Sequence, residues 1–202
     1  MRLDHLAVLG TSLEEAVDHV EASLGVTLGP GGQHAKYGTH NRLMGLEGGL
    51  YLEAIAVEPG VEPQERPRWM DLDRFSGPAR LANWIIRSDD LDGDLAELPS
   101  PSQRIVNLDR GDLRWKMTVP TDGILPFGGM FPSVLQWIGR MPGGSFAPTG
   151  CSLLRLTISH PQAEDLRVAL ARVLSDDRVS VEAGSIGMSA DFDTPSGSRI
   201  LE

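Results

Sequence analysis

The order of its segments constrains this chain more than any other feature, because a pattern of strand, helix and further strands occurs more than once. The first unit opens with an apolar strand at 3–9. Ser12 and Glu15 then have the spacing of a capping box at a helix start, and apolar residues recur at helical spacing as far as Leu24. A Gly-rich turn at 29–32 leads to strand segments at 39–46 and 50–57, so the helix is followed by two or three strands. This order predicts a βαβββ module.

The same order returns in the rest of the chain. The second unit consists of a strand, a short acidic helix, a hairpin and a closing strand: 81–87, 88–98, 104–108, 113–119 and 134–138. A third, shorter unit has a strand pattern at 153–158 and an amphipathic helix that begins near Pro161. Such internal repetition predicts modules at 1–60, 78–142 and 151–202, of which the first two are expected to form one compact domain.

Composition and charge exclude several classes of function. The 202 residues carry a formal net charge of −10, and the basic residues are scattered among the acidic ones, which argues against a nucleic-acid-binding surface. The single cysteine, Cys151, excludes an intrachain disulfide and a thiolate zinc site. We find no signal-peptide pattern at the N-terminus and no apolar run approaching the ~20 residues of a membrane span. A cytoplasmic protein that binds neither nucleic acid nor membrane is therefore expected.

Two polar side chains stand out because of the strand faces they occupy. Side chains alternate along a strand, so His5 lies on the face opposite to Leu6 and Val8, which point toward the helix. Glu53 shares a strand face with Tyr51. A carboxylate in an apolar strand is costly unless it is paired or bound to a cation. An imidazole and a carboxylate suit a divalent first-row metal; the alternative is that they hydrogen-bond each other or reach solvent.

Short motifs in the first two units resemble a known superfamily. The first set is Leu3-Asp4-His5-Leu6-Ala7-Val8, the capped helix and Tyr51-Leu52-Glu53; the second is Gly31-Gly32-Gln33-His34, Gly38-Thr39-His40-Asn41 and Pro126-Phe127 with Gln136-Trp137. Together they resemble the glyoxalase-like subset of the vicinal oxygen chelate superfamily, which includes glyoxalase I, extradiol dioxygenases and bleomycin-resistance proteins. The resemblance implies an α+β fold in which tandem βαβββ modules form a curved mixed sheet shaped like a cup, with a truncated third βαβ-type unit.

The resemblance also implies where a metal would bind. The superfamily takes one ligand from the first strand and one from the last strand of each paired module, and His5 and Glu53 fall on these positions. Alignment of the second module places Asn83 and Gln136 there, and no histidine occurs between residues 41 and 159. Amide carbonyls are weak ligands for a transition metal. The implied cofactor is therefore a weakly held divalent Zn, Ni, Mn or Fe ion with open positions, or none.

A substrate pocket follows from the same resemblance, which implies that His34 and Asn41 line the cavity. The alternative is that Asn41 satisfies backbone groups of a turn. Tyr51 belongs to the expected pocket with Glu53, and the aromatic residues of the second module, Trp115 and Phe127 among them, either wall the pocket or pack in the core. Glu53 and His34 are the residues expected to transfer protons.

The expected function is that of a glyoxalase-like enzyme that uses a divalent metal on a small carbonyl or enol-forming substrate. Whether it is an isomerase, a lyase or an oxygenase stays open. Glyoxalase I itself is not expected, because two of its four ligand positions are amides here. The alternative is a metal-free protein that binds or sequesters a small molecule, as bleomycin-resistance proteins do. The sequence also leaves open whether the chain forms a homodimer.

Overall fold

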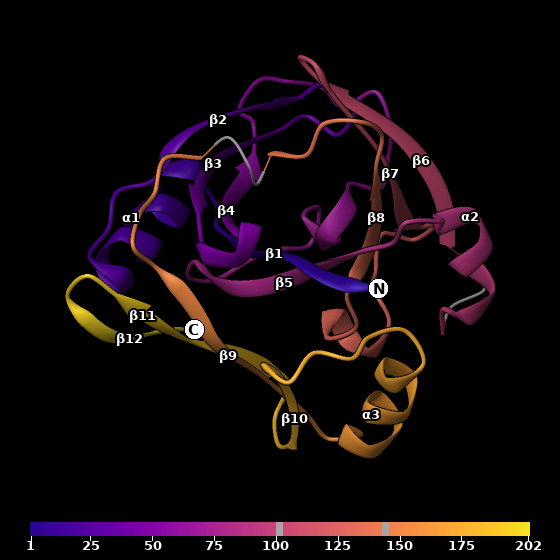
Figure 1. The fold of residues 1–202 in the computed structure, drawn as a ribbon. Helices are drawn as coiled ribbons and strands as arrows, with labels where there is room; N and C mark the ends of the chain where they lie inside the picture. The colour runs from indigo at the N-terminus through magenta and orange to yellow at the C-terminus, as the bar shows by residue number, and fades with distance from the viewer. Residues whose placement is uncertain (100–102, 143–145) are drawn as a thin grey trace.

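The computed structural model describes residues 1–99, 103–142 and 146–202, and these residues form two β-sheets (Figure 1). The larger sheet has eight strands in the order β2-β3-β4-β1-β5-β8-β7-β6, and the smaller has four in the order β10-β9-β11-β12. Figure 1 shows the larger sheet curling round into a cup. The predicted α+β fold with a curved mixed sheet is confirmed.

The first four strands of the larger sheet form one half of the cup. In this half β1 (Arg2–Leu9) and β4 (Tyr51–Val57) pair in parallel at the centre of the sheet. Antiparallel pairing then adds β3 (Thr39–Gly45) and the edge strand β2 (Gly29–His34). The helix α1 (Leu13–Leu24) connects β1 to β2.

Local sequence explains the limits of α1. The Ser12 hydroxyl accepts a hydrogen bond from the Glu15 amide at 3.1 Å, and Gly25 ends the helix with a φ of 68°. The Gly-rich segment after the helix differs from the prediction, because it is part of β2 and not a turn. A Cβ at Gly31 would lie 1.8 Å from the Asn41 carbonyl oxygen, so glycine lets β2 and β3 approach closely.

The second half of the cup repeats this arrangement. Here β5 (Arg80–Arg87) pairs in parallel with β8 (Ser133–Trp137), and β7 (Leu113–Pro120) and β6 (Gln103–Arg110) follow. The predicted acidic helix is a single turn, α2 (Leu91–Asp94), followed by a 3-10 turn. The two halves join where β1 and β5 pair antiparallel, which makes one continuous sheet.

The smaller sheet contains a βαβ unit. Its strand β9 (Ser152–His160) leads through α3 (Ala163–Ala171) to β10 (Val179–Ala183), which pairs with β9 in parallel. The hairpin of β11 (Gly187–Thr194) and β12 (Gly197–Leu201) completes the sheet. The pairing differs from that of the first half, in which α1 leads to an edge strand three positions away from β1.

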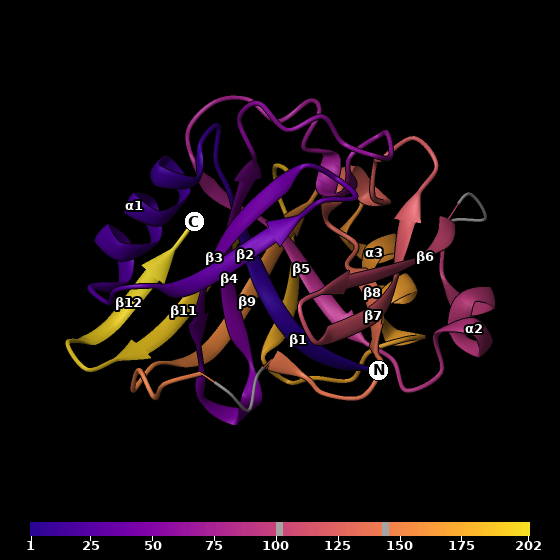
Figure 2. The ribbon, with the colours of Figure 1, turned by 90° about the horizontal axis from the view of Figure 1, so that it is seen from above.

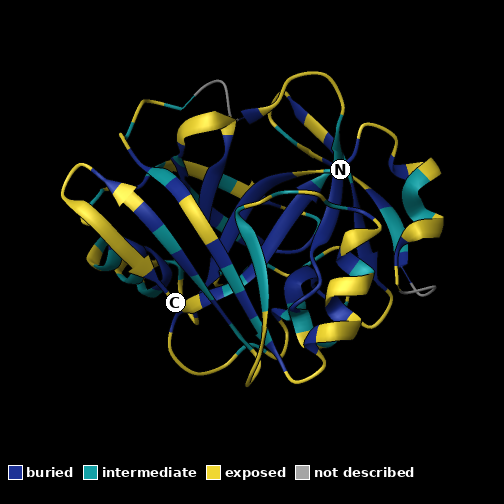
Figure 3. Ribbon diagram, turned by 60° about the horizontal axis from the view of Figure 1, so that its bottom comes forward, coloured by how far each residue is buried: buried dark blue, intermediate teal, exposed yellow. Residues whose placement is uncertain are grey.

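The larger sheet has a different apolar cluster on each face. On the convex face, Leu6 and Val8 of β1 belong to a core that also contains residues of α1 and of the smaller sheet, such as Ile158. Figure 2 shows α1 next to the β11–β12 hairpin. Figure 3 shows the inner strands buried, while β12 and the outer side of α3 are exposed. On the concave face, Leu9 and Ile55 belong to a second cluster rich in aromatic residues. Among the described residues, no helix is long and apolar enough to span a membrane.

Candidate functional site

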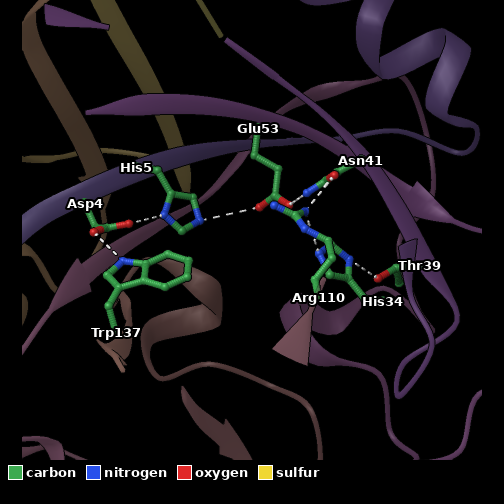
Figure 4. A network of polar contacts seen from close by, with 8 residues as sticks. All are labelled: Asp4, His5, His34, Thr39, Asn41, Glu53, Arg110 and Trp137. Atoms are coloured by element: carbon green, nitrogen blue, oxygen red, sulfur yellow. Dashed lines mark hydrogen bonds and ion pairs between the residues drawn. The ribbon is translucent and has the colours of Figure 1, made fainter. Parts of the chain in front are cut away.

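The candidate site is a small cavity on the concave face of the cup. It has a volume of about 30 Å³ and is lined from both halves of the sheet. Its polar and aromatic lining includes His5, His34, Asn41, Tyr51, Glu53, Trp69, Arg110, Trp115 and Trp137. A volume of this size accommodates about two water molecules. Figure 4 shows the polar contacts that surround it.

A buried chain of three polar groups forms the first part of the site. The Nε2 atom of His5 lies 3.5 Å from Oε2 of Glu53, and its Nδ1 atom lies 2.8 Å from Oδ1 of Asp4 (Figure 4). The other oxygen of Asp4 accepts hydrogen bonds from Arg87 at 3.2 Å and from the Trp137 indole at 3.1 Å. Asp4 therefore fixes the orientation of the imidazole, whose second nitrogen faces Glu53.

The fold explains how adjacent residues Asp4 and His5 both reach this network. The pairing of β1 with β5 shifts between Leu3 and His5, so the strand has an irregularity at Asp4. A bulge of this kind changes the direction of a side chain. The ring of Tyr51, which is the partner of His5 on β4, stacks on the imidazole at 4.2 Å between centroids.

Electrostatic effects within the network favour its charged forms. Burial raises the pKa of Glu53, but hydrogen bonding and attraction to His5 outweigh it and lower that pKa from 4.5 to about 2. Burial lowers the pKa of His5, but its hydrogen bonds to Asp4 and Glu53 outweigh this effect and raise it. Burial also raises the pKa of Asp4, but the hydrogen bond with His5 helps to lower it overall. Glu53 is therefore a carboxylate at neutral pH.

Arg110 and His34 form the second part of the site. The Arg110 guanidinium contacts His34 Nε2 at 3.2 Å, and Thr39 Oγ1 lies 3.0 Å from His34 Nδ1. Since a guanidinium only donates, Nε2 is the acceptor and the proton of the neutral ring sits on Nδ1, facing Thr39. Burial lowers the pKa of His34 from 6.5 to about 4, and the positive charge of Arg110 acts in the same direction.

Asn41 connects the two parts. Its Nδ2 donates to Oε1 of Glu53, while its Oδ1 accepts from Arg110 at 3.0 Å and from the Gly32 amide at 2.8 Å. A Cβ at position 32 would lie 2.6 Å from Cδ of Arg110, so the glycine leaves the space that the arginine occupies. The contact between the edge strands β2 and β6 thus brings Arg110 over the cavity.

The structure does not bring Gln136 to this site. Leu135 and Trp137 line the cavity, so Gln136 lies on the opposite face of β8. Its side-chain oxygen accepts from the Leu91 amide at 3.2 Å and its nitrogen donates to the Asp89 carbonyl at 2.9 Å, next to the start of α2. The sequence alignment places β8 one residue out of register, and a shift of one residue exchanges the two faces of a strand.

Asn83 is also absent from the cavity. On β5 it pairs with Ala7, whereas Ile85 pairs with His5, and its side chain lines a different cavity. Phe127, expected in the pocket, packs against His160 at 5.5 Å between ring centroids. The structure does place the predicted residues His34, Asn41, Tyr51, Glu53 and Trp115 on the cavity wall with His5.

Three residues of the site were not expected from the sequence: Asp4, Trp69 and Arg110. Trp69 packs edge-on against His34 at 4.9 Å, and Trp115 and Trp137 lie 5.4 Å apart. The Gly31-Gly32 pair is the one signal in the sequence that points to Arg110, because paired glycines in a strand indicate the close approach of another group.

The residues present do not fit the four-ligand metal centre implied by the resemblance. His5 Nε2 and Glu53 Oε2 are 3.5 Å apart, a separation that two atoms bound to one zinc ion at about 2.0–2.2 Å can have. A catalytic zinc ion, however, has three protein ligands. Within residues 1–99, 103–142 and 146–202, no group of three His, Cys, Asp or Glu side chains is arranged to hold a metal ion.

Comparison with known proteins places the chain in a family. The sequence model of the glyoxalase-like domain matches residues 3–174. A hypothetical protein from Staphylococcus aureus has a similar structure, with a TM-score of 0.62 and 16% identity over 91% of this chain and 86% of that one. Methylmalonyl-CoA epimerases have lower TM-scores. The enzyme from Mycobacterium tuberculosis has a TM-score of 0.42 and 21% identity, over 67% of this chain and 86% of the epimerase. The enzyme from Streptomyces coelicolor has a TM-score of 0.44 and 17% identity, over 69% of this chain and 96% of the epimerase. Comparison with curated proteins gives no match. The match over most of the chain and the cup-shaped fold together show that this protein belongs to the glyoxalase-like domain family of the vicinal oxygen chelate superfamily.

Proposed function

We propose that this chain is an enzyme that transfers a proton next to a carbonyl group of a small anionic substrate in the His5–Glu53 cavity. The observation that carries the proposal is the position of Arg110. Its guanidinium contacts His34 and Asn41 at the cavity, and it forms no ion pair with any described carboxylate. A cation that forms no ion pair, at a cavity largely shielded from water, attracts an anionic ligand.

Glu53 is the proposed base. It is the carboxylate among the described residues that line the cavity, and its low pKa keeps it ionised. The same low pKa makes Glu53 a weak base in the free protein. A bound anion raises the pKa of a neighbouring carboxyl group, so substrate binding makes Glu53 a stronger base.

The proposed step moves one proton and one electron pair. Glu53 takes the proton from the carbon next to the carbonyl group, and the electrons of that C–H bond form a C=C bond while the carbonyl π electrons move to oxygen. Arg110 stabilises the resulting enolate oxygen, because it donates hydrogen bonds into a site largely shielded from water. Return of the proton to carbon completes an isomerisation or an epimerisation.

Substrate entry requires a side chain to move, because the cavity accommodates only about two water molecules. Arg110 is half-buried and lies at the end of β6, so it is the side chain that moves in this proposal. It opens the cavity and then closes over the anion.

Hydrogen exchange tests the proposal. A panel of 2-oxo and 3-oxo acids is incubated with the protein in D₂O, and NMR follows deuterium at the carbon next to the carbonyl group. We expect exchange with at least one acid, loss of exchange in Glu53→Gln, and weaker binding in Arg110→Gln. Glu182→Gln and Arg114→Gln alter exposed residues of the same type and serve as controls. Arg110-dependent binding without exchange would contradict the enzyme and favour a binding protein, the alternative from the sequence. Exchange that occurs only with an added divalent metal would contradict the metal-free step.

A further inference from the structure

A second and larger cavity lies next to the His5–Glu53 cavity. Its volume is about 540 Å³, within the range of about 300–1,000 Å³ found for small-molecule sites. Its walls come from the turns at Trp69–Asp71 and Phe127–Gly129, the start of β5 and the start of β11. Met70 lines this cavity and the His5–Glu53 cavity, so the two are neighbours.

The large cavity offers an apolar surface. Most of its buried lining residues are apolar: Leu9, Leu81, Leu125, Met130 and Met188. Its charged residues are engaged with neighbouring groups or exposed to water. Asp71 forms an ion pair with Arg74 at 2.6 Å, the Arg80 guanidinium lies 4.3 Å from the centre of the Phe75 ring, and Glu202 is exposed. The cavity therefore suits an uncharged hydrocarbon group.

Met70 separates the two cavities. Its neighbour Trp69 lines the small cavity, its other neighbour Asp71 lines the large one, and Met70 itself is only 4% exposed. Methionine is unbranched and has three rotatable side-chain bonds, so it changes its position without a change in the backbone. Rotation of this one side chain joins the small cavity to the large one.

The backbone at this partition is strained. Met70 and Asp71 have φ values of 54° and 55°, in the left-handed region that residues other than glycine rarely adopt. Two hydrogen bonds hold the turn, from the Asp71 amide to the Gly123 carbonyl at 3.2 Å and from the Leu72 amide to the Trp69 carbonyl at 3.2 Å. Strained residues are concentrated at ligand sites in proteins. The strain here places a flexible side chain between two cavities.

We infer that the substrates of the proposed proton transfer are 2-oxo acids with an apolar chain, and that this chain lies in the large cavity beyond Met70. The inference rests on the proposed function. In such an acid the chain leaves from the carbon that loses the proton, on the side away from the carboxylate. With the carboxylate beside Arg110 and that carbon at Glu53, the small cavity has no room for a chain, because it accommodates only about two water molecules. The large cavity is the adjoining space, and burial of hydrocarbon there supplies affinity.

A series of acids of increasing length tests where the chain binds. Calorimetric titration compares 2-oxobutanoate, 2-oxohexanoate and 2-oxooctanoate, and we expect binding to tighten about fourfold for each added CH₂ group. In 2-oxoadipate a carboxylate replaces the terminal methyl group of 2-oxohexanoate, so this acid should bind more weakly than 2-oxohexanoate. Equal affinities of 2-oxohexanoate and 2-oxoadipate would overturn the apolar chain site.

A substitution in the large cavity tests the location. A Cβ at Gly187 meets no atom within 4 Å, and this residue lines the large cavity, so Gly187→Phe fills the space with little strain. Gly184→Phe is the control, because Gly184 is exposed, makes ordinary contacts and lies outside the lining. We expect Gly187→Phe to abolish the gain in affinity with chain length and Gly184→Phe to keep it. An unchanged gain in a folded Gly187→Phe protein would refute the site.

A variant of Met70 tests its role as the partition. Stopped-flow tryptophan fluorescence measures association of 2-oxooctanoate and of pyruvate, and Met70→Ala should raise the ratio of the two rates, because only the long chain has to pass this side chain. An unchanged ratio would overturn that role.

Hydrogen exchange separates this inference from the proposed function on which it rests. Glu53-dependent exchange of pyruvate protons in D₂O, together with equal affinities for short and long acids, would overturn the chain site and leave the proton transfer standing. Tighter binding of the longer acids without exchange would overturn the proton transfer but not the chain site. Failure of every acid to bind would overturn both.

Discussion

His34 is expected to make the stability of this protein depend on pH, and the effect can be isolated by one substitution. The imidazole is buried, its Nδ1 faces Thr39 and its Nε2 accepts from Arg110, so the folded protein holds it in the neutral form. Its pKa falls from 6.5 to about 4, mainly because of burial. Between these values the unfolded chain binds a proton that the native protein does not bind.

The sign and size of the effect follow from this difference. Where the unfolded state binds more protons, the free energy of unfolding rises with pH, so stability is lost as the pH falls from 6.5 toward 4. A shift from 6.5 to about 4 corresponds to about 3 kcal/mol in full, and to about 2 kcal/mol between pH 7 and pH 5. The raised pKa of His5 acts in the opposite direction, so the wild-type curve alone does not isolate His34.

Urea unfolding of wild type and His34→Gln between pH 4.5 and pH 8 measures the contribution of His34 to the pH dependence of stability. The effect of His5 cancels in this comparison, because His5 is present in both proteins. The free-energy difference between them should change by about 2 kcal/mol from pH 7 to pH 5, with the variant losing less stability on acidification. Thr39→Val is the control: it removes the partner of Nδ1 but keeps the imidazole, so it should lower stability and retain the wild-type slope. Equal slopes in wild type and His34→Gln would refute the assignment of a buried neutral imidazole.

Four further outcomes are expected. Since folding lowers the pKa of Glu53 from 4.5 to about 2, its contribution to stability is lost as the pH falls through this range, and Glu53→Gln should flatten that part of the unfolding curve. Gly32→Ala should displace Arg110 and raise the pKa of His34, which NMR titration would detect; an unchanged pKa would show that the arginine tolerates a Cβ at position 32. Trp84 is fully buried, so Trp84→Ala should lower the free energy of unfolding in urea by about 3–5 kcal/mol. A loss of less than ~1 kcal/mol would contradict its packing role. Dialysis against EDTA should leave Tm unchanged, because His5 and Glu53 alone do not make a metal centre; a lowered Tm would show a bound ion.

The alternation of side-chain direction along a strand was enough to find His5 and Glu53, the part of the site that the first module supplies on β1 and β4. His5 and Glu53 lie on the cavity face, and Leu6 and Val8 lie in the core on the other face, as the two-residue period predicts. This prediction succeeds because both strands pair regularly with each other over this stretch, so their side-chain directions follow from the sequence alone.

The equivalent residues of the second module could not be found in this way. Gln136 lies on the wrong face because a one-residue error in register reverses a strand, and β8 has only five residues to fix its alignment. Asn83 lies on a strand whose pairing with β1 is shifted at two places. Asp4 was missed for a similar reason, since an irregularity in β1 sends its carboxylate to the imidazole beside it.

Arg110 depends on a contact that no local pattern contains. It reaches the cavity because the edge strands β2 and β6, which belong to different modules, meet at the mouth of the cup. Gly32 was attributed to a turn, whereas its missing side chain provides the space for the arginine. Sequence periodicity describes single strands, so it identifies the groups on a strand face but not the partner that closes over them.

The charges of the network decide what such a cavity can hold. With His5 in the protonated form that its raised pKa favours, Arg87, His5 and Arg110 supply three positive charges against the two carboxylates of Asp4 and Glu53. Ion pairs join Arg87 to Asp4, Asp4 to His5 and His5 to Glu53, so the charges of these four residues compensate one another. The excess positive charge therefore resides on Arg110. An unpaired charge at a low-dielectric site is costly, and a monoanion bound beside Arg110 removes that cost. In the proposed function, Arg110 therefore selects an anionic ligand, whereas the His5–Glu53 pair, which the strand pattern reveals, supplies the group that accepts the proton.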